Sequence, residues 1–279
     1  MTINTILTVL TDQNANAACL EHAIGLAKGL DAHLDVMALG IDPVQVGYAY
    51  GGMDALVKEA SIGRVTQTAN EVAKWAEERV QASGLRYNVE PAVALLSGAH
   101  QLVGTHGRFS DVIVVPQPYA DKAGPETETL LESALFHSST PVIVVPPKAT
   151  ARAKPQKIVA GWNDSAQSLA AIKAALPLMR EADLVSLTII DPPKHGADRS
   201  DPGGAISQFL ARHGVHVEIS VLAKTMPRVG DVLMRHAEDF GADMIVSGAY
   251  GHTRFREALL GGATRRLLEQ SSVPMFMMH

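Results

Sequence analysis

The residues best suited to chemistry in this chain form a cluster of glycines near its end. The cluster follows an apolar run at residues 244–246 and precedes a stretch with helical spacing at residues 263–270. Glycines between a strand and a helix let backbone N–H groups approach an anion, because no Cβ stands in the way, and the positive end of the helix adds to the attraction. The pattern predicts a phosphate site, although a plain turn with a helix cap would explain a lone glycine cluster equally well. The glycines are Gly248, Gly251, Gly261 and Gly262.

The spacing of these glycines is more particular than their number. Gly248-x2-Gly251-x9-Gly261 resembles the nucleotide loop of the universal stress protein family, G-x2-G-x9-G followed by serine or threonine. The resemblance continues through Leu259-Leu260-Gly261 and through Ser272-Val273-Pro274 with its closing apolar run. It breaks at Gly262, where the family has a hydroxyl, although the backbone N–H remains and Thr264 stands two residues on. The resemblance implies an adenine nucleotide, ATP or another, with Mg²⁺ only as its companion.

The resemblance also implies roles for residues outside the glycine loop. The acidic residue that follows the first strand of the family's domain corresponds to Asn163, with Asp164 beside it, and the residue whose backbone contacts adenine corresponds to Ile189. Asn163 can hydrogen-bond a ribose hydroxyl but carries no charge. Asp164 could equally cap the following helix or form an Asx-turn, and His252 could contact phosphate or lie at the surface. The full candidate set is Asn163, Asp164, Ile189, Gly248, Gly251, His252, Gly261, Gly262, Ala263 and Thr264.

Short apolar runs alternate with helical stretches along the whole chain. Strands are expected at residues 5–10, 33–39, 87–95, 111–115, 141–145, 158–162, 184–190, 215–222, 244–246 and 275–278, with helices between most of them. This alternation is typical of parallel βαβ units joined by right-handed crossovers. The fold class predicted is α/β: two tandem, doubly wound, five-stranded parallel sheets with helices on both faces. The family resemblance implies the adenine-nucleotide α-hydrolase-like version of that fold.

The chain contains an internal duplication. Ser138-Ser139-Thr140-Pro141 and Ser271-Ser272-Val273-Pro274 close the two copies, and Asp111 and Asp243 open matching strands. The proline-rich, basic stretch before residue 157 is typical of a linker, so we predict domains at residues 1–146 and 157–279 with a linker at 147–156. We also predict that the closing strands pair with each other in an intrachain pseudo-dimer, as in the family's dimers, because short apolar edge strands tend to be covered. Whether two chains then form a homodimer stays open.

The first copy lacks the glycines of the second. Pro116 and Pro118 stand where the second copy has Gly248 and Gly251, and Glu128 and Thr129 stand at the places of the later pair. Proline has no N–H to donate, and a carboxylate repels phosphate. We therefore expect one nucleotide per chain, in the second copy.

Composition excludes several classes of protein. The 279 residues are 47% hydrophobic and 19% charged, which is typical of globular chains. A net charge of −5 disfavours nucleic acid as a partner, and no apolar run reaches the length of a transmembrane helix. The N-terminus lacks the features of a signal peptide, and the single cysteine excludes an intrachain disulfide, so we expect a cytoplasmic protein. Charge is uneven: 9 basic against 16 acidic residues up to position 150, and 15 against 13 after it.

Two classes of function fit these features. The first is a stress-response module that binds a nucleotide and client proteins, without a catalytic centre or with only weak hydrolysis. The second, less favoured, is a nucleotide-hydrolysing enzyme, because no positioned general base or magnesium carboxylate pair is evident near the loop. A scaffold that binds no nucleotide is the alternative favoured by Gly262 and Asn163. Arg265 and Arg266 are expected on a solvated helix face.

Overall fold

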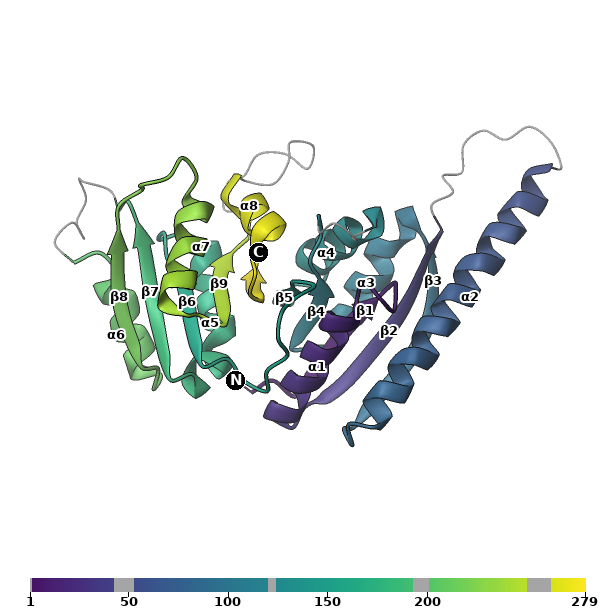
Figure 1. Ribbon diagram of the computed structural model, residues 1–279, viewed down its shortest axis with the longest axis horizontal. Helices are drawn as coiled ribbons and strands as arrows, with labels where there is room; N and C mark the ends of the chain where they lie inside the picture. The colour runs from purple at the N-terminus through teal and green to yellow at the C-terminus, as the bar shows by residue number, and fades with distance from the viewer. Residues whose placement is uncertain (1, 43–52, 120–123, 193–200, 250–261) are drawn as a thin grey trace.

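The structure is a computed structural model that describes residues 2–42, 53–119, 124–192, 201–249 and 262–279. Strands and helices alternate throughout (Figure 1). The first half contains β1 (Thr5–Leu10), α1 (Ala17–Leu30), β2 (His33–Asp42), α2 (Met53–Gln81), β3 (Tyr87–Leu95), the 3₁₀ turn η1 (Leu96–Gly98), α3 (Ala99–Gly107), β4 (Val112–Pro116), α4 (Pro125–His137) and β5 (Val142–Val145). The second half contains β6 (Lys157–Gly161), α5 (Ala166–Glu181), β7 (Leu184–Ile190), α6 (Gly204–Arg212), β8 (Val217–Leu222), α7 (Val229–Phe240), β9 (Met244–Gly248), α8 (Gly262–Gln270) and β10 (Met275–Met278).

The strands form one sheet in the order β3-β2-β1-β4-β5-β10-β9-β6-β7-β8. Strands within each half are parallel, and the second half repeats the order of the first. The predicted pairing of the closing strands is confirmed, because β10 lies antiparallel to β5 with Phe276 opposite Ile143. This pairing makes the two five-stranded sheets continuous, so the molecule has one ten-stranded sheet where the sequence pattern predicts two.

Helices cover both faces of the sheet, and each face has its own core. One core lies under α1, α2, α5 and α6, and the other lies under α3, α4, α7 and α8. Both cores run across the seam between the halves: Ile143 and Phe276 belong to the first core, and Val144 and Met275 belong to the second. Burial on both faces explains why the strands consist of continuous apolar runs rather than alternating ones. Among the described residues, no helix is both long and apolar enough to cross a bilayer.

The second strand is longer than the sequence pattern indicates. Residues 40–52 are turn-rich in sequence, yet β2 continues through Gly40 to Asp42. The reason is tertiary: α2 crosses the strand so closely that a Cβ on Gly40 would lie 2.4 Å from the carbonyl oxygen of Val65. A glycine that suggests a turn here permits a close helix–strand contact instead.

The duplicated aspartates share one structural role. The Asp111 carboxylate accepts hydrogen bonds from the backbone N–H groups of Asn4 and Thr5, at 2.8 and 3.0 Å. The Asp243 carboxylate accepts the same pair of bonds from Gln156 and Lys157. Each aspartate therefore holds the start of the first strand of its own half.

The stretch between β5 and β6 packs against α1. A Cβ on Gly29 would lie 2.1 Å from the backbone oxygen of Ala153, and one on Gly25 would lie 3.0 Å from that of Arg152. Only glycines in α1 allow the two backbones to come this close.

A buried histidine lies where α1 meets this stretch and β9. His22 is 4% exposed, and neither ring nitrogen has a hydrogen-bond partner among the described residues. It lines a cavity of about 10 Å³ together with Arg152 and Asp243, the two charged groups that face it there. Burial lowers the pKa of His22 to about 4. The imidazole is therefore neutral in the folded protein at neutral pH.

Acidification is expected to destabilise the fold through His22. Its pKa is about 4 when folded and about 6.5 when unfolded, so the unfolded chain binds the extra proton and stability falls as pH drops between these values. From about pH 7.5 to about pH 5 the loss is on the order of 2 kcal/mol. Urea denaturation at both pH values, in wild type and in His22→Leu, measures the difference.

The control for this prediction is Leu26→Ala, which enlarges the same cavity but keeps the titrating ring. It should lose stability at both pH values and retain the wild-type pH dependence. An equal pH dependence in wild type and His22→Leu would show that His22 does not contribute.

Candidate functional site

The candidate site lies at the edge of the sheet where the strands of the second half end. In the parallel register Gly161 of β6 lies beside Thr188 of β7, and Ala160 lies beside Val246 of β9. The carboxyl ends of β6, β7 and β9 therefore meet at one edge. α8 follows β9 and leads back to β10, which is parallel to β9, so α8 begins at this same edge. Doubly wound sheets bind ligands at such an edge.

After β6 the chain makes a tight turn into α5. The side-chain oxygen of Asn163 accepts hydrogen bonds from the N–H and hydroxyl of Ser165, at 3.3 and 2.7 Å. The Ser165 hydroxyl in turn accepts a bond from the N–H of Ser168 and caps the helix. Asp164 is exposed and has a φ of 58°, in the left-handed region. The Asx-turn therefore belongs to Asn163 and the cap to Ser165, so the suggestion that Asp164 makes either one is wrong.

Ile189 lies near the end of β7 with its side chain buried. It is 5% exposed, and a Cβ on Gly203 would lie 2.6 Å from its Cδ1 atom. Gly203, with a φ of 89°, is the residue before α6. The side chain of Ile189 thus packs under the start of α6, and its backbone stands at the sheet edge.

Gly248 is required by packing within the protein. A Cβ at this position would lie 2.6 Å from both the backbone carbon of Gln167 and the backbone nitrogen of Ser168. The end of β9 therefore touches the first turn of α5 backbone to backbone. The glycine spacing predicts a phosphate contact here, whereas the contact with α5 explains this glycine without a ligand.

Ser247 is a polar group that the sequence argument does not select. It is 8% exposed, and its hydroxyl has no hydrogen-bond partner among the described residues. A buried hydroxyl without a partner is costly in an apolar setting. No sequence signal marks it, because a single serine at a strand end is common.

The start of α8 suits an anion better than the start of α4. No acidic residue lies in the first turn of α8, which begins at Gly262 and places Thr264 in a buried position. In the first half, α4 begins with Pro125 and carries Glu126 and Glu128 in its first turn. A carboxylate already complements the positive end of α4.

The structure thus brings part of the predicted set together. The carboxyl edge holds Asn163, Asp164, Ile189 and Gly248, with Gly262, Ala263 and Thr264 at the start of α8. Gly251, His252 and Gly261 lie outside the described residues. Within the described ranges, no group of three or more His, Cys, Asp or Glu side chains is arranged to hold a metal ion.

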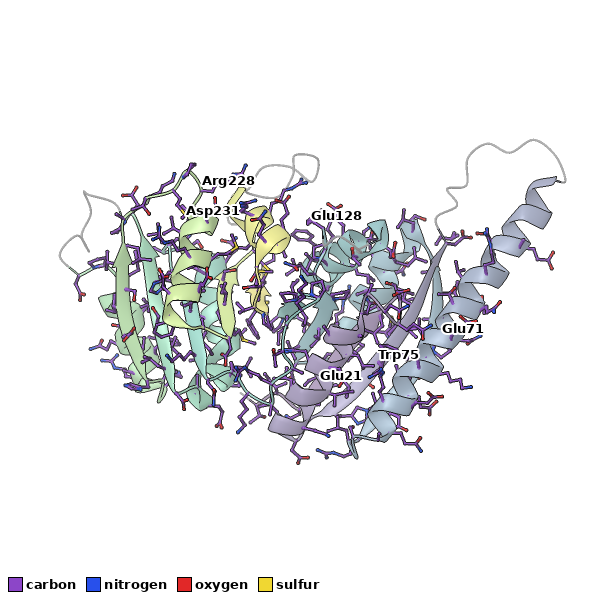
Figure 2. All side chains as sticks on the ribbon, in the orientation of Figure 1. Glu21, Glu71, Trp75, Glu128, Arg228 and Asp231 are labelled. Atoms are coloured by element: carbon purple, nitrogen blue, oxygen red, sulfur yellow. The ribbon has the colours of Figure 1, made fainter. Side chains whose placement is uncertain are left out.

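The expectation that Arg265 and Arg266 form a solvated helix face is wrong. The Arg266 guanidinium is 2.6 Å from the Asp231 carboxylate of α7, and its side chain is 26% exposed. Arg265 pairs with Glu269 at 2.7 Å and lies over the ring of Tyr119, from the first half, at 5.1 Å. Asp231, the partner of Arg266, is labelled on α7 in Figure 2, as is Glu128 on α4 of the first half. Both arginines therefore attach α8 to its neighbours.

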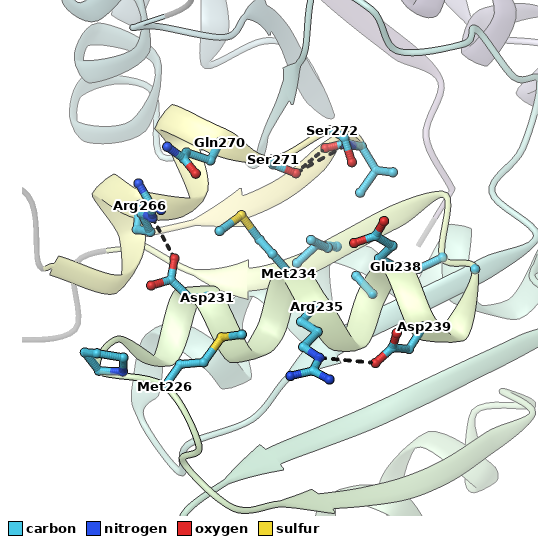
Figure 3. Close-up of a pocket in the computed structure, with 16 residues that line it drawn as sticks. Met226, Asp231, Met234, Arg235, Glu238, Asp239, Arg266, Gln270, Ser271 and Ser272 are labelled. Carbon is cyan, nitrogen blue, oxygen red and sulfur yellow. Dashed lines mark hydrogen bonds and ion pairs between the residues drawn. The ribbon is translucent and has the colours of Figure 1, made fainter.

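A groove of about 1070 Å³ separates α7 from α8 (Figure 3). None of the predicted site residues that the structure describes lines it, so it is distinct from the predicted site. The Asp231–Arg266 pair spans it, and Arg235 and Asp239 form a second, looser pair at 3.8 Å on its α7 side. No sequence pattern indicates it, because its walls come from two helices that meet only in the fold.

One serine–histidine contact occurs under α7. The Ser186 hydroxyl is 2.9 Å from His236 Nε2 and 2.9 Å from the Ser220 hydroxyl. Ser186 is fully buried, and burial lowers the pKa of His236. The contact satisfies polar groups between α7 and the sheet, and the serine cannot reach a substrate.

The fold and this edge define a tandem, doubly wound α/β protein with a candidate anion site in its second half. Residues 154–279 match the model of the universal stress protein family. A universal stress protein of Synechocystis sp. is 27% identical over 99 residues, which cover 32% of this chain and 33% of that protein. This chain therefore spans about a third of that relative's length. The second half of the chain is therefore similar to a universal stress protein domain.

Solved structures extend the likeness in fold to the whole chain. A universal stress protein from Archaeoglobus fulgidus matches with a TM-score of 0.73 at 16% identity, covering 99% of this chain and 96% of its own. A structure described as a putative universal stress protein from Pseudomonas aeruginosa matches with a TM-score of 0.62 at 16% identity, covering 99% and 93%. The first half, which the family model does not match, thus shares the fold of such two-domain proteins.

Proposed function

We propose that this chain is a cytoplasmic stress-response protein that binds one adenine nucleotide, ATP foremost, at the carboxyl edge of its second half. The phosphates lie at the start of α8, and the nucleoside lies between Asn163 and the backbone of Ile189. Mg²⁺ enters only with the nucleotide. Client proteins respond to the bound state, and hydrolysis is absent or weak.

The observation that carries this proposal is the contrast between two helix starts. α8 begins with glycine and has no carboxylate in its first turn, whereas α4 has two. The buried Ser247 hydroxyl, close to the same edge, supports a polar ligand there. The glycine spacing and the more basic second half point the same way.

A scaffold that binds no nucleotide is the second candidate. Two observations favour it: the Asn163 oxygen is already engaged by Ser165, and Gly262 supplies no hydroxyl. A nucleotide would have to displace or share the Ser165 contact.

Calorimetric titration of ATP into the full chain, with and without Mg²⁺, is the test. We expect a stoichiometry near one. Gly261→Asp should weaken binding roughly tenfold to a hundredfold, because it places a carboxylate and a Cβ where phosphate approaches. Gly63→Asp is the matched control, because nothing lies within 4 Å of a Cβ at this glycine of α2 in the other half. Release of ADP and phosphate during the titration would indicate hydrolysis.

Two results would contradict the proposal. A stoichiometry near two would place a nucleotide in the first half as well. No heat with the wild type would favour the scaffold.

Glu128→Gly would place a glycine at the corresponding position of the first half. It is not a neutral control, because Glu128 accepts a hydrogen bond from the Tyr119 hydroxyl.

A further inference from the structure

The first half contacts both ends of α8. At its start, the Arg265 guanidinium lies over the ring of Tyr119, whose hydroxyl donates a hydrogen bond to Glu128 at the start of α4. At its end, the buried side chain of Gln117 donates a hydrogen bond to the backbone oxygen of Ser271 at 3.1 Å. Figure 1 shows α4 and α8 on either side of the seam.

Arg265 keeps its charge in this contact. Its hydrogen bond with Glu269 raises its pKa, and the nearby Tyr119 and Glu128 groups act in the same direction. A permanent cation over an aromatic face is an attractive pair, and the acidic Glu128 behind the ring strengthens it.

The first half is also linked, through His279, to the residue that follows β9. Ala249 donates its N–H to the backbone oxygen of Met278 at 2.8 Å, and its carbonyl oxygen is 3.1 Å from Nδ1 of His279. The ring of His279 meets Phe136 of α4 edge-on, with ring centroids 4.8 Å apart. The end of β9 and both ends of α8 are thus all tied, directly or through one residue, to the first half.

We infer that the first half is a brace that positions the end of β9 and the start of α8, the two elements between which the second half binds its ligand. Tyr119, Glu128 and Phe136 are its positioning residues, and they act through Arg265 and His279. Glu128, one of the residues that make the first copy unsuitable for phosphate, therefore has another role, because it holds Tyr119, which contacts α8 through Arg265. That the second half binds a ligand rests on the proposed function, but the brace itself does not.

Hydrogen exchange measured by mass spectrometry on the full chain tests the brace. In Tyr119→Ala we expect the amides of α8 to exchange roughly threefold to tenfold faster, while those of β6 and β7 keep their wild-type rates. Tyr119→Phe keeps the ring under Arg265 and should restore most of the protection. Phe109→Ala removes an aromatic side chain that is 83% exposed in the same half, and it should change nothing.

A second variant covers the case in which Tyr119→Ala does not fold. Arg265→Met removes the cation from a side chain that is 35% exposed, and Arg265→Lys keeps a charge there. Because Arg265→Met also removes the ion pair with Glu269 within α8, Glu269→Gln is its control. Faster exchange in Arg265→Met than in Glu269→Gln, with rescue in Arg265→Lys, supports the brace. Wild-type exchange of α8 in Tyr119→Ala, or in Arg265→Met should Tyr119→Ala not fold, would overturn it.

ATP titration separates the brace from the proposed function. If the wild type binds ATP, Tyr119→Ala should bind it roughly threefold to tenfold more weakly although it touches no ligand, and Tyr119→Phe should recover. Unchanged affinity together with unchanged exchange overturns the brace. If the wild type binds no ATP, the proposed function fails, and the exchange of α8 alone decides for or against the brace.

Discussion

Truncating Phe276 to alanine is expected to lower the free energy of unfolding by about 3–5 kcal/mol. Phe276 is fully buried in β10, directly opposite Ile143 of β5, at the seam that joins the two halves. Removing the ring leaves a cavity in a core that continues from one half into the other. We therefore expect both halves to lose stability together.

The two tryptophans allow each half to be followed separately. Trp75 lies in α2 and Trp162 follows β6, so Trp75→Phe and Trp162→Phe each leave one reporter. Urea denaturation with either reporter should give the same midpoint, and Phe276→Ala should lower both, since coincident transitions mark one cooperative unit. The control is Ile219→Ala, at a side chain 41% exposed on the edge strand β8, with an expected loss of about 0.5 kcal/mol or less. A shift seen by Trp162 alone would show that the seam does not couple the halves.

Gly248→Ala is expected to destabilise the protein by about 1–3 kcal/mol in the absence of any nucleotide. The new Cβ would lie 2.6 Å from backbone atoms of Gln167 and Ser168, and backbone cannot move aside as the end of a side chain can. β9 or α5 must shift, and both are packed in the core. Thermal and urea unfolding of the ligand-free chain measure the loss.

Gly161→Ala is the matched control for Gly248, because it lies at the same edge of the sheet. Its Cβ would meet Leu233 at 3.4 Å, an ordinary contact with a flexible side chain. We expect little change from Gly161→Ala. Equal stability of Gly248→Ala and wild type would mean that the contact with α5 is not what requires glycine, and would return Gly248 to a role in ligand binding alone.

Gly248→Ala by itself does not separate stability from binding. A loss of ATP affinity in Gly248→Ala could come either from a displaced strand end or from a lost phosphate contact. Gly261→Asp, with Gly63→Asp as its control, is therefore the sharper test of the nucleotide site. The brace variants at Tyr119 test a third property, the position of α8, without changing a residue of the proposed site.

The sequence by itself determined the fold class, the duplication and the pairing of the closing strands. The hydrophobic pattern of a segment indicates which of its faces are buried. The continuous apolar runs of these strands indicate burial on both faces. Each Ser-Ser-x-Pro ending leads from a helix into a buried strand, and the hydroxyl of its first serine, Ser138 or Ser271, accepts a hydrogen bond from the backbone N–H two residues on. Pairing of β5 with β10 was predicted from their short, apolar character, because such edge strands tend to be covered, and from the resemblance to the family's dimers.

Only the tertiary structure decided which partners the individual side chains have. Arg265 and Arg266 have the sequence spacing of a solvated face, yet their partners Tyr119 and Asp231 lie 146 and 35 residues away. Gly248 has the spacing of a phosphate loop, and its closest neighbour is the backbone of α5. His22 lies in α1, and only the packing of α1 against two other segments leaves its ring buried with no hydrogen-bond partner among the described residues. Local spacing determines the direction in which a side chain points, whereas the group it meets there depends on segments that folding brings from elsewhere in the chain.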